Sequence, residues 1–238
     1  MDNEELRDRV LVHLYNKYYE FGFAQPIDTR QVVLDAGIPS ENSYLAYRNV
    51  SYLAESSLIK GVKPSGEKYP IGISITSNGI DTVERKHKEF SKPHSDIRFN
   101  ILANLYEYNF KDHNESMIPI DINFIKSIRL TGSDQNFVIA DINYLDDKAL
   151  IKGFRQLGVP YPYCAHITSR GINTVESVIN QSLVSIAKSD TNEKARAEEI
   201  THESNGRSKL QKFHDFVGEN AGWIELIANV ARASLSGG

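Results

Sequence analysis

Only one cysteine, Cys164, occurs among the 238 residues of the sequence. A lone cysteine excludes an intramolecular disulfide and is typical of proteins that work in a reducing compartment. Long apolar runs are also missing, since none approaches the roughly 18 residues that a membrane span requires. The first five residues are mostly acidic and no apolar segment follows a basic one, so we predict no secretory signal. These absences predict a cytoplasmic protein with no membrane span.

Sequence motifs typical of catalytic or metal-binding sites are absent as well. The histidines are scattered, and the only His–Cys pair at strand spacing, His166 with Cys164, supplies too few ligands for a structural zinc site. Residues 61–68 match a phosphate-binding loop only loosely, because Glu67 interrupts the pattern and no Ser or Thr follows Lys68. We therefore expect no catalytic residue, no metal and no cofactor, and interpret the chain as a protein that is not an enzyme.

An excess of positive charge is the last missing feature. Lys and Arg number 27 against 31 Asp and Glu, which gives a net charge of −4 and a pI near 6.0. Duplex-binding proteins normally show a basic face or a high pI, although acidic regulators can concentrate their basic residues locally. Composition therefore leaves DNA binding open.

What the sequence does contain is an internal duplication. Residues 75–84 return as residues 167–176 with eight of ten positions identical, and Leu-Ile-Lys-Gly at 58–61 returns at 150–153, both at a shift of 92. Pro-Ile-Asp at 26–28 returns after 93 residues, so the shift drifts only across loops, where insertions are tolerated. The duplication divides the chain into a first domain over residues 1–92, a second domain over 93–184, a polar linker or solvated helix over 185–209 and an apolar C-terminal helix over 210–238.

Both copies have the same expected order of elements: three helices, a hairpin and a closing helix. In the first copy apolar residues recur at helical spacing over 6–21, and strand alternation follows at 59–63 and 69–75. Turn residues at Gly37 and Pro39 separate the second helix from a third that begins near Ser40 or Asn42. The pattern predicts a mainly α fold with small β-hairpins, in the α+β class.

This order, with the tract Tyr-Leu, Leu-Ile-Lys-Gly, a hairpin, Ile-Thr-Ser-x-Gly-Ile and Val-Glu in both copies, resembles the winged helix-turn-helix family of prokaryotic transcriptional regulators. The resemblance covers residues 4–182 and implies two tandem winged-helix domains followed by a C-terminal helical tail. In that family the third helix enters the major groove and the wing touches the DNA backbone. Other members are protein-docking modules.

The resemblance implies double-stranded DNA as a partner and points to specific side chains. Those of the first copy offer amide, guanidinium, phenol and ammonium groups suited to bases or phosphates. They are Asn42, Ser43, Tyr44, Tyr47, Arg48, Lys60, Lys63 and Lys68. The equivalent contacts of the second copy are Lys126, Arg129, Gln135, Asn136, Lys152 and Arg155.

The second copy is a weaker candidate for DNA binding. Asp134 and Asp141 lie on its third helix, where we expect them to repel phosphates. Its hairpin loop, residues 156–163, is apolar and aromatic, which suits a protein contact. Alternatively, Tyr161 and Tyr163 pack on their own domain.

From Leu210 onward, apolar residues recur at alternating spacings of three and four. A helix with this much apolar surface requires a partner: the domains of its own chain, a second copy fixed in register by Asn220, or a membrane surface. The residues expected in oligomerisation or docking are Phe213, Val217, Asn220, Trp223, Ile224, Ile227 and Ala231. Two hypotheses follow, a DNA-binding regulator that self-associates through its tail and an adaptor whose winged helices and tail hold a protein partner.

Overall fold

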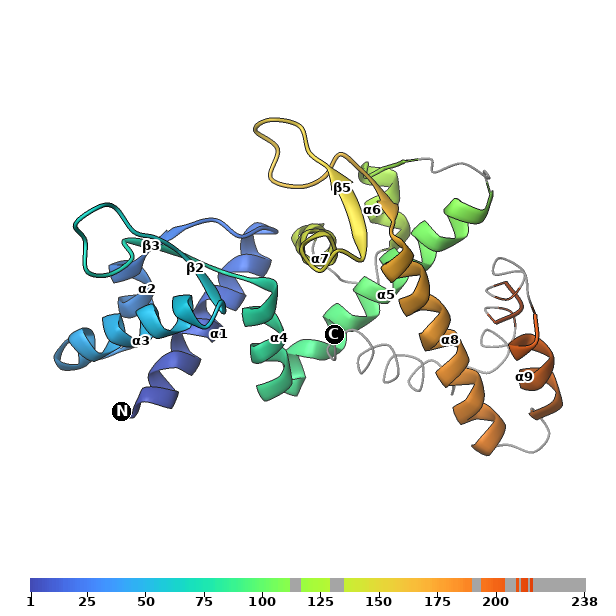
Figure 1. The fold of residues 1–238 in the computed structure, drawn as a ribbon, viewed down its shortest axis with the longest axis horizontal. Helices are drawn as coiled ribbons and strands as arrows, with labels where there is room; N and C mark the ends of the chain where they lie inside the picture. Colours follow the sequence, from blue (N-terminus) through green and yellow to red (C-terminus); the bar gives the residue numbers. More distant parts are fainter. Residues whose placement is uncertain are drawn as a thin grey trace. The chain divides into compact units, whose positions relative to one another are not determined.

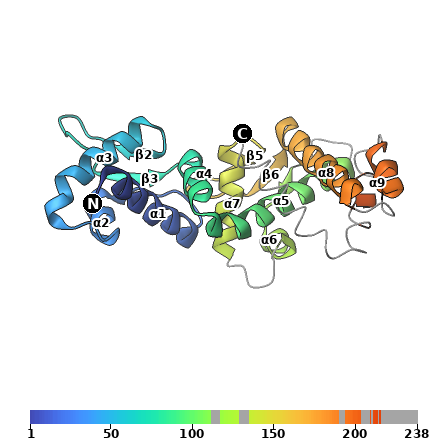
Figure 2. The same cartoon turned by 90° about the horizontal axis from the view of Figure 1, so that it is seen from below.

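The computed structural model describes residues 1–111, 117–128, 135–189 and 194–203, together with 209, 211–213 and 215 (Figure 1, Figure 2). It is mainly helical, with two small antiparallel sheets of three strands each, which confirms the predicted α+β class. The chain forms two compact units, one of residues 1–91 and 134–140 and the other of residues 92–133 and 141–238. The start of the second copy's third helix thus belongs to unit 1, a placement that the repeat boundaries did not predict.

Unit 1 is organised around its first helix, which packs against the second, third and fourth helices and against the central strand of its sheet. This helix begins after Asp2, whose carboxylate accepts a hydrogen bond from the Glu5 amide, and ends at Gly22 in the left-handed conformation. The elements are α1 (Asn3–Phe21), β1 (Ile27–Asp28), α2 (Thr29–Asp35), the 3-10 turn η1 (Ser40–Asn42), α3 (Ser43–Glu55), β2 (Ile59–Val62), β3 (Gly72–Ile75) and α4 (Ser77–Lys86).

Unit 2 repeats this order. Its elements are α5 (Lys88–Lys111, of which residues 88–91 belong to unit 1), β4 (Ile118–Pro119), α6 (Ile122–Ile128), α7 (Gln135–Asp147, of which 135–140 belong to unit 1), β5 (Ile151–Phe154), β6 (Cys164–Ile167), α8 (Ser169–Ser189) and α9 (Lys194–Thr201). Helix α9 lies in the stretch expected to be a linker or solvated helix, yet it packs against α8 and buries Ala197 and Ile200.

The two sheets have the same strand order and the same register. The strand orders are β1-β3-β2 and β4-β6-β5, and in each the middle strand is antiparallel to both neighbours. Ile59 lies opposite Ile75 in the first sheet, and Ile151 lies opposite Ile167 in the second. The duplicated tracts therefore specify the pairing of the hairpin strands.

A second shared feature joins the end of the third helix to the start of the closing helix. Thr76 caps α4: its hydroxyl donates to the Leu58 carbonyl at 3.0 Å and accepts from the Gly79 amide at 3.1 Å. Thr168 makes the same two bonds, with Leu150 and Gly171, at the same distances. Both glycines lie so close to the carbonyl they face that a Cβ would overlap its oxygen.

A buried tyrosine–glutamate hydrogen bond is also duplicated. The Tyr15 hydroxyl donates to Oε1 of Glu84 at 3.2 Å, and the Tyr106 hydroxyl donates to Oε1 of Glu176 at 3.0 Å. Burial, reinforced by the bond to Glu176, raises the pKa of Tyr106 well above its usual value, so this tyrosine remains a donor even in alkaline solution. Each pair ties the first helix of a copy to its closing helix.

Replacing Gly171 with alanine should destabilise the protein because the new methyl group would overlap the Leu150 carbonyl. We expect a loss of about 1–3 kcal/mol in the free energy of unfolding, measured by chemical denaturation. Ser169→Ala, an exposed change in the same turn of α8, is the matched control and should alter stability by less than about 0.5 kcal/mol. Equal stability of the two variants would contradict the close-approach argument.

Acid should weaken the fold through His13. Burial lowers the pKa of His13 below its ordinary value of 6.5, although Asp35, 4.0 Å from Nε2, acts in the opposite direction. Because the pKa is lowered, the folded state takes up a proton at His13 less readily than the unfolded state does. The contribution of neutral His13 to the free energy of unfolding is therefore complete above pH 6.5 and is lost as the pH falls through the lowered pKa. In denaturation curves between about pH 7 and 5, His13→Gln should show a smaller loss of stability than the unmodified chain. Parallel curves would exclude His13 as a source of the acid sensitivity.

Candidate nucleic-acid interface

Helix α3 presents one face to solvent because its apolar residues recur on the other. Ala46, Val50 and Leu53 are buried at spacings of three and four, which leaves Tyr44 and Arg48 exposed on the outer face. Three further predicted residues, Asn42, Ser43 and Tyr47, are half-buried at the start of the helix. The structure therefore brings the predicted α3 residues together around one end of the helix.

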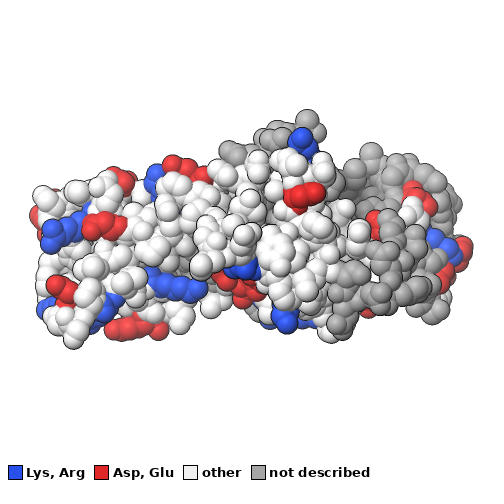
Figure 3. Space-filling model, turned by 90° about the horizontal axis from the view of Figure 1, so that it is seen from above, with Lys and Arg blue, Asp and Glu red and all other residues white. Residues whose placement is uncertain are grey.

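The predicted cations of the first copy are available to a partner. Arg48, Lys60 and Lys63 are exposed, and among the described residues none of the three has an ion-pair partner. Figure 3 shows that Lys and Arg alternate with Asp and Glu over the described part of the face in view, without a continuous basic patch. The described part of this face therefore has no extended positive surface.

Aromatic rings gather around Lys68, between α3 and the loop that joins β2 to β3. Tyr47 stacks on Tyr69 with ring centroids 5.6 Å apart, and Tyr44 meets Tyr69 edge to face at 6.4 Å. The Lys68 ammonium lies 5.6 Å from the Tyr44 ring centroid and 5.4 Å from that of Tyr69. Lys68, predicted as a phosphate contact, is thus part of an aromatic cluster.

A hollow of about 500 Å³ lies next to this cluster. Tyr47 of α3 lines it together with residues of the hairpin loop and the start of α2. The hollow was not predicted from the sequence, because Arg30 and Tyr69 belong to separate segments that only the fold brings together. Its polar and aromatic lining includes Asp28, Thr29, Arg30, Tyr47, Glu67 and Tyr69.

The corresponding end of the second copy's third helix is engaged by protein. Residues 135–140 lie in unit 1, where the Tyr18 hydroxyl donates to the Ala140 carbonyl at 2.7 Å. Nδ2 of Asn136, a predicted DNA contact, donates to the Glu20 carbonyl at 2.8 Å. The amide of Asn136 is therefore bonded to the end of α1.

Apolar contacts reinforce these hydrogen bonds. Tyr19 and Phe137 meet edge to face with ring centroids 5.8 Å apart. Gly22 leaves room for Ile139, since a Cβ at position 22 would lie 3.1 Å from its Cγ2. Val138, Ile139 and Ala140 are buried. The start of α7 is a packed element of unit 1, whereas the start of α3 faces solvent.

The second copy's cations are less available than those of the first. Arg155 forms an ion pair with Asp146 at 2.8 Å and donates to the Pro160 carbonyl at 3.0 Å. The Lys152 ammonium lies 5.5 Å from the ring centroid of Phe154. Lys126 and Gln135 are exposed, and Arg129 lies outside the described residues.

The prediction that Asp141 faces phosphates is wrong. Its side chain is fully buried, accepts a hydrogen bond from Nε of Arg98 at 2.7 Å and lies 3.0 Å from Nδ1 of His94. Asp141 follows Val138 by three residues and precedes Leu145 by four, and both are 0% exposed, so helical periodicity places it on the inner face. Asp134 lies outside the described residues.

In the first copy, an asparagine takes the place of the carboxylate in this cluster. Arg7 donates from Nε to Asn49 at 2.7 Å, and Asn49 in turn donates to Asn3 at 2.8 Å. In both copies the guanidinium lies over a tyrosine of the third helix: Arg7 is 3.9 Å from the Tyr52 centroid, and Arg98 is 3.6 Å from that of Tyr144. One scaffold therefore supports two different charge arrangements.

The second hairpin exposes apolar groups. Leu157 is fully exposed at the loop and Tyr163 is about half exposed, at 53%. Tyr161 is half-buried. Tyr163 is therefore only partly packed on its own domain, and Tyr161 is more covered.

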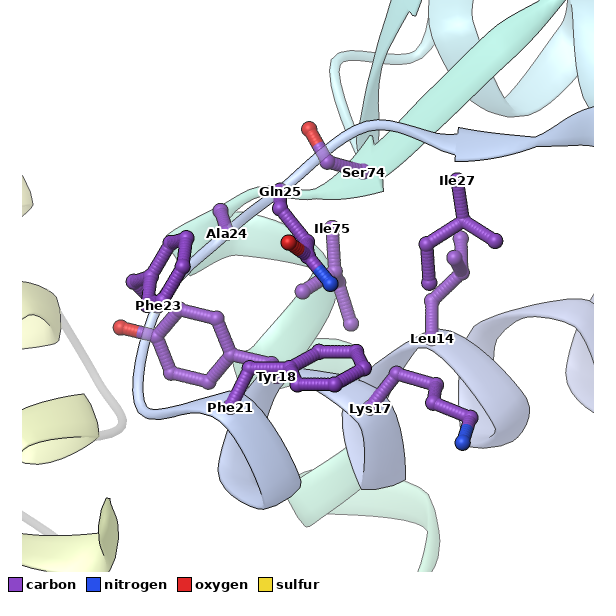
Figure 4. Close-up of a pocket in the computed structure, with 10 residues that line it drawn as sticks. All are labelled: Leu14, Lys17, Tyr18, Phe21, Phe23, Ala24, Gln25, Ile27, Ser74 and Ile75. Carbon is purple, nitrogen blue, oxygen red and sulfur yellow. The ribbon is translucent and has the colours of Figure 1, made fainter. Parts of the chain in front are cut away.

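A small pocket at the end of α1 holds no ligand-sized space. Its volume is about 10 Å³, room for a water molecule at most. Figure 4 shows Tyr18, Phe21 and Phe23 gathered around it beside the Gln25 amide. We interpret it as a packing defect in the wall of unit 1.

The tail falls largely outside the described residues. Of the seven residues expected in docking, only Phe213 is described, and it is 2% exposed. Val217, Asn220, Trp223, Ile224, Ile227 and Ala231 lie outside the described part of the chain.

Within the described ranges, no three His, Cys, Asp or Glu residues cluster as metal ligands do, and no helix has the length and apolarity to cross a membrane. Cys164 is a buried free thiol whose sulfur lies 3.4 Å from that of Met117. No family model, curated protein or solved structure matches the chain.

Tyr18→Phe should loosen the packing of residues 135–140 in unit 1, because it removes the buried bond to the Ala140 carbonyl. We expect a loss of about 1 kcal/mol in the free energy of unfolding and faster amide exchange in residues 135–140. Tyr108→Phe is the control, since Tyr108 is 40% exposed and no hydrogen bond to its hydroxyl is present among the described residues. If exchange at 135–140 were unchanged in Tyr18→Phe, the contact would not hold this segment.

Proposed function

We propose that the protein is a DNA-binding transcriptional regulator that contacts double-stranded DNA with one face of its first winged-helix domain. The observation that carries the proposal is the exposure of Tyr44 and Arg48 on α3 and of Lys60 and Lys63 on the hairpin. None of these three cations is held in an ion pair among the described residues. Free cations next to an exposed helix start are what phosphate contacts require.

The contrast between the copies supports this assignment. The start of α7 is packed in unit 1, and Arg155 is paired with Asp146. A side chain already bonded within the protein would have to break that bond to reach DNA. We therefore assign DNA contact to the first copy. We propose further that the apolar C-terminal segment serves self-association.

The modest charge of the face predicts modest affinity. Each neutralised phosphate contributes about −0.9 to the slope of log K against log salt. With three free cations and Lys68 engaged by aromatic rings, the slope should be close to −3 rather than the steep values of strongly basic proteins. Binding should weaken markedly between low and physiological salt.

Lys63→Gln should weaken binding to a genomic duplex by a similar factor for every sequence and reduce the salt slope by about 1, because it removes one phosphate contact. Fluorescence anisotropy at several salt concentrations measures both quantities. Lys126→Gln, an exposed lysine of the second copy, is the matched control and should leave the slope unchanged. If Lys126→Gln changed the salt slope and Lys63→Gln did not, the DNA contact would have to be assigned to the second copy.

A protein-docking adaptor is the second candidate, and one observation favours it: the exposed Leu157 and Tyr163 on the second hairpin. Exposed apolar and aromatic groups in one loop suit a protein contact. A protein that co-purifies in stoichiometric amount after nuclease treatment and is lost from Leu157→Ser would support the adaptor. Retention of that protein by Leu157→Ser would exclude this loop as its docking site.

A further inference from the structure

We propose that the hollow beside Tyr47 and Tyr69 binds one unpaired nucleobase, so that the preferred DNA is a duplex interrupted by an unstacked base. The inference rests on the proposed function, because it assigns the flanking duplex to the cations of the same face. It adds a second contact, with different chemistry, to the proposed phosphate contacts.

The size of the hollow fits this ligand. At about 500 Å³ it lies within the range of roughly 300–1,000 Å³ found for small-molecule sites. A nucleobase with its sugar fits within such a space, whereas a duplex is far too wide to enter. The hollow adjoins α3 at Tyr47, the residue that precedes Arg48.

Two tyrosines give the lining aromatic surface against which a base can pack. Tyr47 and Tyr69 both border the hollow, and Tyr44 continues the cluster on the outer side. Stacking on tyrosine requires a base whose face is not already covered by its neighbours. The outer face of α3 also carries tyrosines where Asn, Gln or Lys would read groove edges.

The charges in the hollow select a base edge over a phosphate. Asp28 and Glu67 contribute carboxylates and Arg30 contributes one guanidinium. The two carboxylates would repel a phosphate. A base that carries N–H donors beside carbonyl acceptors can donate to a carboxylate and accept from the guanidinium. The Asp28 carboxylate already accepts from the amides of Arg30 and Gln31, whereas Glu67 and Arg30 have no side-chain hydrogen bond among the described residues.

Guanine satisfies these groups best. Its Watson–Crick edge offers N1–H and N2–H₂ donors that a carboxylate accepts, and its O6 and N7 accept from arginine. Thymine offers a single N–H donor. The hollow should therefore prefer an unpaired guanine over an unpaired thymine.

The test uses the full chain and three labelled duplexes of the same sequence: fully paired, with one bulged guanine, and with one bulged thymine. We expect the guanine bulge to bind at least about fivefold tighter than the paired duplex, with the thymine bulge in between. Tyr47→Ala should abolish the preference for both bulges. Glu67→Gln, an exposed change that leaves the core untouched, should reduce the guanine preference alone.

The controls separate the two proposals. Lys63→Gln should weaken all three duplexes by the same factor and preserve the bulge preference. Equal affinity for bulged and paired duplexes in the unmodified chain would overturn the base site and leave the proposed function standing. A bulge preference that survives both Tyr47→Ala and Glu67→Gln would also overturn it. Failure to bind any of the duplexes would overturn the proposed function and the inference together.

Discussion

Each copy is held in shape by the place where its third helix ends and its closing helix begins. Thr76 bonds to the Leu58 carbonyl, Gly79 lies against that same carbonyl, and the strand starting at Ile59 leaves from this point. The end of α3, the start of β2 and the start of α4 therefore all lie at the carbonyl oxygen of Leu58. The second copy rebuilds the junction with Thr168, Gly171 and Leu150. Everything proposed for the interface depends on it, because the junction fixes the angle between α3 and the hairpin.

This junction also explains why so much of the fold could be predicted from the sequence. The residues that make it lie in the tracts repeated at a shift of 92, and local signals such as the Thr cap and the glycines act within a few residues of chain. Helix and strand positions follow from periodicity for the same reason. The α+β class and the pairing of the hairpin strands were accessible because they depend on short-range patterns.

The parts that could not be predicted depend on contacts between distant segments. The hollow combines Arg30, Tyr47 and Glu67, which no local pattern associates. From the sequence, Asp141 is expected to be a surface carboxylate. In the fold it is buried, because it pairs with Arg98, which lies 43 positions away in the chain. The packing of residues 135–140 in unit 1 likewise rests on Tyr18 and Tyr19 of α1. Whether a charged side chain on a helix is buried or exposed depends on its partner, and a partner that is distant in sequence becomes known only from the fold.

The loops that join the hairpin strands have a consequence of their own. In both copies the last paired residues, Val62 with Gly72 and Phe154 with Cys164, enclose nine residues, and the same backbone bond from Ile71 to Val62 or from Tyr163 to Phe154 closes each loop. One loop is rich in lysine and the other in apolar groups, yet the frame beneath them is unchanged. The two loops are therefore interchangeable in length and closure, and transplanting residues 63–71 onto β5 and β6 would change the side chains of the second hairpin loop without a new fold.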